Sequence, residues 1–156
     1  MNRSAAAILA GLAAACAAAA SPARAAPYDE ARYHAALAGI GALQEETLAI
    51  AGALALGMTQ SRAQVLAPHM HERLQWLRAA RAAAASADTA TLRHGGQKGA
   101  PPYARCIVWR AGDLEDHVQD AATNVALLAR GADPAGLIPL DRGRIAAESL
   151  RKNCPR

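Results

Sequence analysis

The sequence contains no phenylalanine, and aromatic residues make up only 3% of it. Surfaces that bind sugars or single-stranded nucleic acid stack their ligands on aromatic side chains, so this composition argues against both ligand classes. CxxCH, HExxH, P-loop and GxGxxG motifs are all absent, and the few serines lack a nucleophile-elbow context. We therefore expect a non-enzymatic protein without a motif-bound cofactor, and keep a small exported enzyme of unidentified type as an alternative.

Lysine is also scarce, since Lys98 and Lys152 are the only two. The formal net charge of +4 owes much to Arg3 and Arg24, because the first 25 residues contain no acid. The remaining 131 residues carry a net charge of +2, with acidic and basic residues interleaved. Such a pattern is typical of an ordinary solvated surface and excludes a nucleic-acid partner.

Residues 1–25 have the pattern of a cleavable signal peptide. Arg3 supplies a short positive region, residues 5–20 form an uncharged apolar run, and residues 21–22 (Ser-Pro) break it. Ala-Arg-Ala at 23–25 places small residues at the −3 and −1 positions that signal peptidase requires. The run is shorter than the roughly 20 residues of a membrane-spanning helix. We expect cleavage after Ala25 and a periplasmic or secreted bacterial protein.

Two alternatives would tie the chain to a membrane: an uncleaved leader, or lipidation at Cys16. Ala14 and Ala15 have the small size that a lipoprotein signal needs before its cysteine. Ala13, however, stands where such signals place a leucine-like residue. Cys16 is equally well explained as one more small apolar residue of the leader.

Cys106 and Cys154 are the two cysteines that remain after cleavage. An even number of cysteines in an exported chain indicates a disulfide, because the periplasm keeps such pairs oxidised. A bond between Cys106 and Cys154 would close a loop of roughly fifty residues and stabilise the fold by about 2–4 kcal/mol. Cys106 and Trp109 lie off the main apolar stripe of their helix, so the bond predicts that the last helix covers that face and packs on Trp109.

The fold class is predicted to be all-α, since alanine dominates, apolar residues recur with helical period, and no stretch alternates with period two. We expect residues 26–156 to form one compact bundle with one disulfide and a flexible connector at about 93–102. It comprises three longer helices and a short C-terminal one, at about 29–56, 61–88, 103–130 and 142–153.

Helix ends and core stripes follow from the same pattern. Gly57 and Gly131 are expected to end helices in the left-handed conformation, and Asp141 to cap the last helix. Ser61 with Gln64 has the form of a capping box at the start of the second helix. The third helix has the most regular stripe, formed by Ala104, Ile107, Ala111, Leu114, Val118, Ala121, Val125 and Leu128.

The third helix also carries the best candidate site, formed by Asp113, Asp116, His117 and Asp120. Asp113 and His117 are spaced i, i+4, which could hold a divalent metal given another ligand, such as His69. His69 and His71 point about 200° apart on a regular helix, so they cannot share one ion unless Pro68 distorts the turn. The alternative interpretation is a solvated charged face, with Met70 in the core.

The leading functional hypothesis is a helical binding protein of the bacterial envelope that engages a protein partner or self-associates. Its basis is an apolar surplus near the end of the first helix at Leu48, Leu54 and Leu56, together with the missing catalytic motifs. The alternative is a metal- or small-ligand-binding bundle that uses His117, Asp113 and His69.

Overall fold

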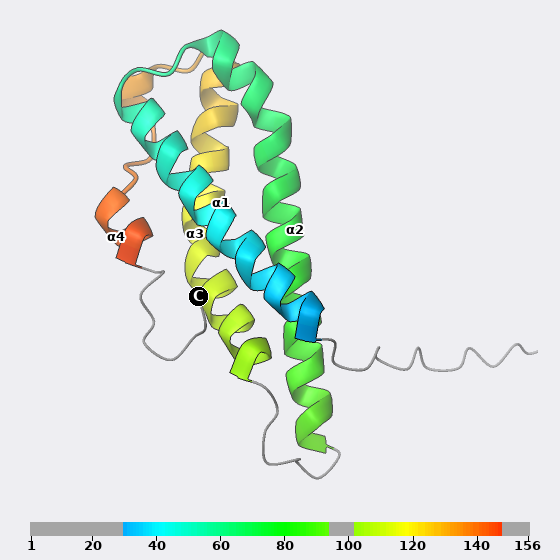
Figure 1. Ribbon diagram of the computed structural model, residues 1–156. Coiled ribbons are helices and arrows are strands. Elements are labelled where there is room, and N and C mark those ends of the chain that lie inside the picture. The colour runs from blue at the N-terminus through cyan, green and yellow to red at the C-terminus, as the bar shows by residue number, and fades with distance from the viewer. Residues whose placement is uncertain (1–29, 94–101, 148–156) are drawn as a thin grey trace, which may run out of the picture.

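The computed structural model describes residues 30–93 and 102–147, and every regular element within them is helical (Figure 1). The predicted all-α bundle of three longer helices and one short helix is therefore confirmed. The predicted leader, the connector and Cys154 lie outside the described residues. The elements are α1 (Glu30–Ala55), α2 (Gln60–Arg93), α3 (Pro102–Ala129), a 3-10 turn η1 (Pro134–Gly136) and α4 (Arg142–Ala147).

The helices α2 and α3 lie antiparallel and share the largest interface of the molecule. α1 crosses this pair obliquely and packs mainly on α3, while its interface with α2 is small (Figure 1). α4 packs on α1 rather than along α3. Two faces of α3 therefore have different neighbours, and this arrangement decides which side chains of α3 are buried.

The core forms around the predicted stripe of α3, all of which is buried. α2 contributes Met70, Leu74 and Leu77, which recur at 4- and 3-residue intervals and are also buried. α1 adds Ile40, Leu43 and Ile50. Periodic apolar positions on three helices thus meet in one continuous cluster, as helix packing requires.

Glycine ends two of the helices as predicted. Gly57 after α1 has φ 87° and Gly131 after α3 has φ 82°, a region that side chains with a Cβ rarely adopt. After α3, the amide of Ala132 donates to the carbonyl of Leu127 at 3.0 Å and the amide of Gly131 to that of Leu128 at 2.9 Å. This pair of bonds is a Schellman closure, which satisfies carbonyls that the helix leaves open.

The start of α2 differs from the prediction. The helix begins at Gln60, and the cap is Thr59, whose hydroxyl accepts a hydrogen bond from the amide of Arg62 at 3.4 Å. The predicted capping box of Ser61 and Gln64 is wrong because Ser61 lies inside α2, past its Thr59 cap, and the Gln64 amide donates to the carbonyl of Ala129 at 3.2 Å. A bond to a neighbouring helix therefore replaces the local one. α2 also continues through Pro68 without restarting.

Two buried amides hold the C-terminal segment against the bundle. The side chain of Asn124 exchanges two 2.8 Å hydrogen bonds with the backbone of Ile138. Gln44 of α1 donates to the carbonyl of Ile145 in α4 at 2.5 Å. Asp141 caps α4 as predicted, accepting from the amide of Arg144 at 3.0 Å. The path of the chain after α3 is thus determined by polar contacts that depend on tertiary structure.

Candidate functional site

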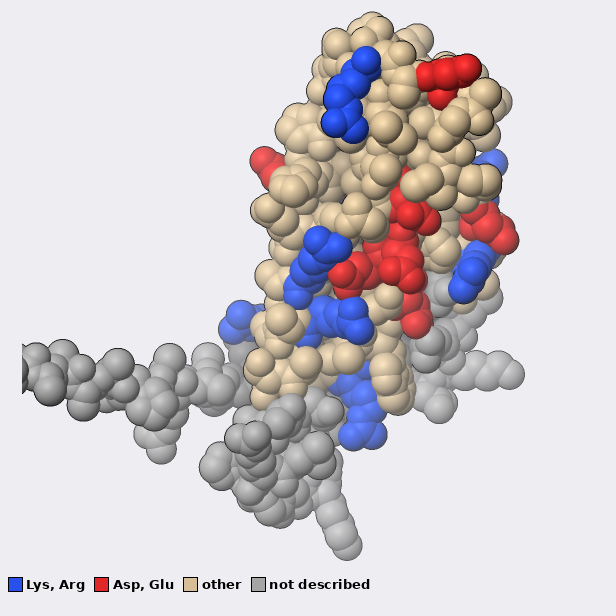
Figure 2. Space-filling view, turned by 180° about the vertical axis from the view of Figure 1, so that it is seen from behind, with Lys and Arg blue, Asp and Glu red and all other residues tan. Residues whose placement is uncertain are grey.

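The acidic face of α3 exists, and Figure 2 shows acidic side chains gathered in a column with basic side chains beside and below them. Asp116 is exposed, whereas Asp113, His117 and Asp120 are half-buried. Asp113 and His117 both take part in interactions within the protein.

The structure does not bring His69 to Asp113 and His117. Arg78 of α2 bonds to Glu115 and Gln119, so it lies level with His117. His69 precedes Arg78 by nine residues, which is about 13 Å along the helix axis at roughly 1.5 Å per residue. It is also exposed on α2. One ion cannot bridge that distance, since metal–nitrogen bonds are about 2 Å long.

No group of three histidine, cysteine or acidic side chains suited to a metal occurs within residues 30–93 and 102–147. The histidines next to Met70 behave as the alternative interpretation expects. Met70 is fully buried, while His71 is exposed and hydrogen-bonded to Gln75 at 2.8 Å. The described residues therefore supply no assembled metal centre, and the metal hypothesis stays a prediction.

Cys106 is buried in α3, as a structural cysteine should be. Its predicted partner, Cys154, lies outside the described residues, so the disulfide stays a prediction. The related expectation for Trp109 is not met by the described part of α4, which packs on α1. Trp109 remains 43% exposed.

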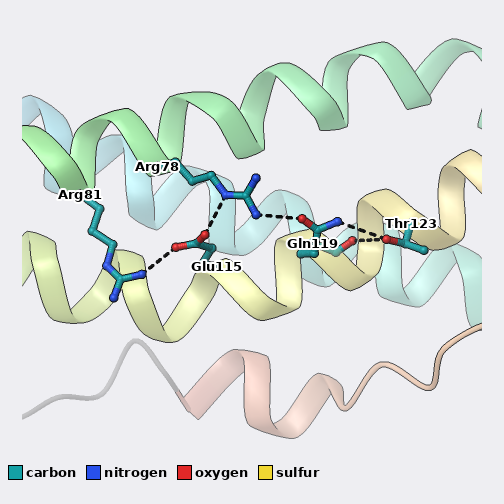
Figure 3. Close-up of polar contacts among 5 residues, drawn as sticks. All are labelled: Arg78, Arg81, Glu115, Gln119 and Thr123. Carbon is teal, nitrogen blue, oxygen red and sulfur yellow. Dashed lines mark hydrogen bonds and ion pairs between the residues drawn. The ribbon is translucent and has the colours of Figure 1, made fainter.

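A network of polar side chains joins α2 to α3 (Figure 3). Glu115 accepts from Arg78 at 2.7 Å through one carboxylate oxygen and from Arg81 at 2.8 Å through the other. Arg78 also donates to Gln119 at 3.0 Å, and Gln119 donates to Thr123 at 3.3 Å. The hydrogen bond from Arg78 lowers the pKa of Glu115, against an opposing effect of burial and with help from Arg81. Glu115 is therefore used to join two helices.

Arg110 is the residue that sequence reasoning missed. It is only 9% exposed, although arginine is rarely buried unless paired. Its guanidinium lies against Gly41 of α1, where an added Cβ would be 3.7 Å from Nη2. Burial lowers the pKa of Arg110. A sequence signal existed: Cys106, Arg110, Asp113 and His117 follow one another at 4-, 3- and 4-residue intervals, a second stripe beside the apolar one.

Exposed apolar side chains occur at the end of the bundle where α1 turns into α2. Leu56 is 90% exposed and Val65 is 66% exposed. Ile138, in the segment held by Asn124 near the end of α3, is also exposed. Leu48 and Leu54 are half-buried, and Leu54 packs against the core. The apolar surplus expected near the end of α1 is thus reduced to Leu56, which directly follows the helix, but Val65 extends it onto α2.

No family model matches the chain, and neither a curated protein nor a solved structure matches it. None of the helices in the described ranges has an apolar stretch long enough to cross a membrane. Function must therefore be argued from the side chains of this protein alone.

Proposed function

We propose that this chain is an exported, non-enzymatic helical binding protein of the bacterial envelope. It binds another protein through the end of the bundle formed by the α1–α2 turn. The observation that carries the proposal is the exposure of Leu56 and Val65, which lie nine residues apart on either side of this turn. Single exposed apolar residues are ordinary, but two so strongly exposed in one short segment favour an interaction surface.

The local structure supports this assignment because it keeps the turn in place. Gly57 ends α1, Thr59 caps α2, and Gln60 and Gln64 both donate to the carbonyl of Ala129 at the end of α3. The segment that carries Leu56 and Val65 is therefore anchored at both ends. A rigid surface loses less conformational entropy on binding than a mobile one, which favours affinity.

The export part of the proposal rests on residues 1–25 and on the cysteine pair. Intact mass measurement of the protein from a periplasmic extract tests both. We expect the mass of residues 26–156 less two hydrogens, for cleavage after Ala25 and a Cys106–Cys154 disulfide. A mass that retains residues 1–25 would contradict export by cleavage, and a lipid adduct on Cys16 would place the protein on a membrane.

The binding part is tested by site-specific photocrosslinking in cells. A photoreactive residue at position 56 or 65 should give one defined adduct with another protein. Ala83, an exposed residue farther along α2, serves as the control position and should give none. Val65→Ser should abolish the adduct formed from position 56. Equal labelling from all three positions would refute the surface, and an adduct of twice the chain mass would assign it to a homodimer.

A further inference from the structure

Arg110 is a charged residue whose side chain has little contact with water. It lies on the face of α3 turned toward α1 and is nine-tenths buried. Gly41 of α1, which has no side chain, lies against its guanidinium. One turn farther along α1, the buried amide of Gln44 donates to Ile145. Gly41 therefore offers the guanidinium no side-chain partner.

No hydrogen bond or ion pair joins Arg110 to any residue of the protein within the described ranges. Asp113, one turn along α3, and Glu45, one turn along α1 from Gly41, are the nearest acids in sequence, and neither pairs with it. The contrast with α2 is direct. Arg78 and Arg81 both bond Glu115, and Arg73 lies 3.3 Å from Glu46.

Such a placement is costly. Transfer of an ion out of water is unfavourable unless another charge or several hydrogen bonds replace its hydration. Most buried ionisable side chains avoid this cost by becoming neutral. Arginine cannot do so, because its guanidinium is not deprotonated in proteins. Since small domains are only marginally stable, a buried guanidinium without a counter-ion among residues 30–93 and 102–147 is a candidate for binding an anion from solution.

We propose that Arg110 anchors a binding site for a small oxyanion, a carboxylate or a phosphate, in the seam between α1 and α3. The guanidinium presents paired N–H donors in a planar fork that matches two oxygens of such a group. The backbone of Gly41 lies beside this fork, where an added Cβ would be 3.7 Å from Nη2. The site lies away from Leu56 and Val65, so this inference does not depend on the proposed protein-binding surface.

The proposal is tested on the wild-type protein by NMR, through the Nε–Hε signals of its arginines. Sodium phosphate, sodium acetate and sodium chloride are titrated separately at constant ionic strength. We expect the Arg110 signal, assigned by its loss in Arg110→Lys, to shift and saturate with phosphate or acetate. Saturation with phosphate alone identifies a phosphate site, and with acetate alone a carboxylate site. A signal that responds to neither, or equally to chloride, overturns the proposal.

Thermal unfolding of two variants gives an independent test. Arg110→Met keeps a long side chain without the charge, so in anion-free buffer its midpoint should exceed that of the wild type. The saturable stabilisation that the oxyanion gives the wild type should be absent in Arg110→Met. Arg142→Met is the matched control, because Arg142 lies beside Gly52 of α1 but is exposed. It should keep the wild-type response.

Two results of the unfolding experiment would overturn the proposal. One is an oxyanion response that persists in Arg110→Met, since the site would then lie elsewhere. The other is a lower midpoint for Arg110→Met than for the wild type in anion-free buffer, since the charge would then be stabilised by the protein itself. The NMR titration does not depend on how well this variant folds.

Discussion

The two interfaces of α3 differ in whether their charged side chains are paired. Toward α2, Glu115 bonds two arginines and Gln119 extends the network to Thr123. Toward α1, Arg110 is buried beside Gly41 without a counter-ion in the described residues. Within the described residues, α3 therefore has one side on which charged side chains are paired and one side on which Arg110 is not. The first is typical of structural packing, and the second of a surface that binds something.

The two interfaces of α3 also differ in size. α2 and α3 share a long antiparallel interface, whereas α1 crosses obliquely and is linked to α4 through the Gln44 amide. A helix with a smaller interface and a desolvated charge beneath it should open more readily than the α2–α3 pair. The following four predictions test this division.

The largest effect is expected for Leu114→Ala, which removes a buried side chain from the α3 core stripe. Truncation of a buried leucine costs about 2–5 kcal/mol, because apolar contact is lost and a cavity remains. Urea unfolding monitored by circular dichroism measures the change. Leu56→Ala removes the same atoms from an exposed position and should change stability little. Similar losses in the two variants would mean that Leu114 is not a core residue.

Gln44→Met should weaken the other interface by about 1–3 kcal/mol, the usual cost of leaving a buried carbonyl without its partner. The loss should be local, since Gln44 is the side chain that donates to the carbonyls of Ile145 and Ala146. Hydrogen exchange should therefore accelerate in α4 and leave the centre of α3 unchanged. Uniform acceleration over all helices would show that α1 and α4 unfold together with the α2–α3 pair.

Gly39→Ala should destabilise by about 1 kcal/mol, although alanine is the better helix former. The new Cβ would lie 2.7 Å from Cη2 of Trp76, so the indole ring must move. In a Trp76→Ala background the same change should be stabilising, because only the gain in helix propensity remains. Thermal unfolding of the four proteins in this cycle measures the coupling. A cycle without coupling would refute the contact between α1 and α2.

The smallest effect is expected for Glu115→Gln, about 1 kcal/mol or less, since its arginine partners are half-exposed and screened by salt. The pKa of Glu115 is lowered in the folded state. Its ionised form therefore stabilises the fold above the ordinary glutamate pKa of about 4.3, and this contribution is lost as pH falls through the lowered pKa.

The difference in stability between the wild type and Glu115→Gln should accordingly shrink in acid. Chemical unfolding at neutral pH and below pH 4 measures it, with Asp116→Asn on the same helix as control. Asp116 is exposed, so the stability of Asp116→Asn should stay closer to that of the wild type at both pH values than the stability of Glu115→Gln does. A difference that stays constant with pH would show that the amide replaces the carboxylate fully.

Sequence patterns predicted those parts of the structure that depend on neighbouring residues. The Ile107–Leu128 stripe follows from helical period alone, and every member is buried. Gly57 and Gly131 end helices because a left-handed residue is needed there, and Asp141 caps α4 through its own backbone neighbours. The capping box at Ser61 failed because Thr59 is the cap, and Gln64 bonds to the end of α3, a partner that no local pattern contains.

The candidate site depends on contacts that a single sequence does not show. Asp113 and His117 are neighbours because they share one helix turn, but the distance of His69 from them is decided by the register between α2 and α3. Arg110 looked like one more surface arginine among seventeen basic residues. Its burial depends on the side on which α1 crosses α3.

By itself, the sequence determined the fold class, the helices and most of their ends, because helical period, alanine content and glycine positions act within a few residues. Only the tertiary structure decided that Gln44 holds α4 on α1, that Asn124 holds the segment at Ile138, and that Arg110 loses its water. These features depend on how helices cross. Crossing depends on side-chain shapes from segments far apart in the chain, where no repeating pattern links one residue to its partner.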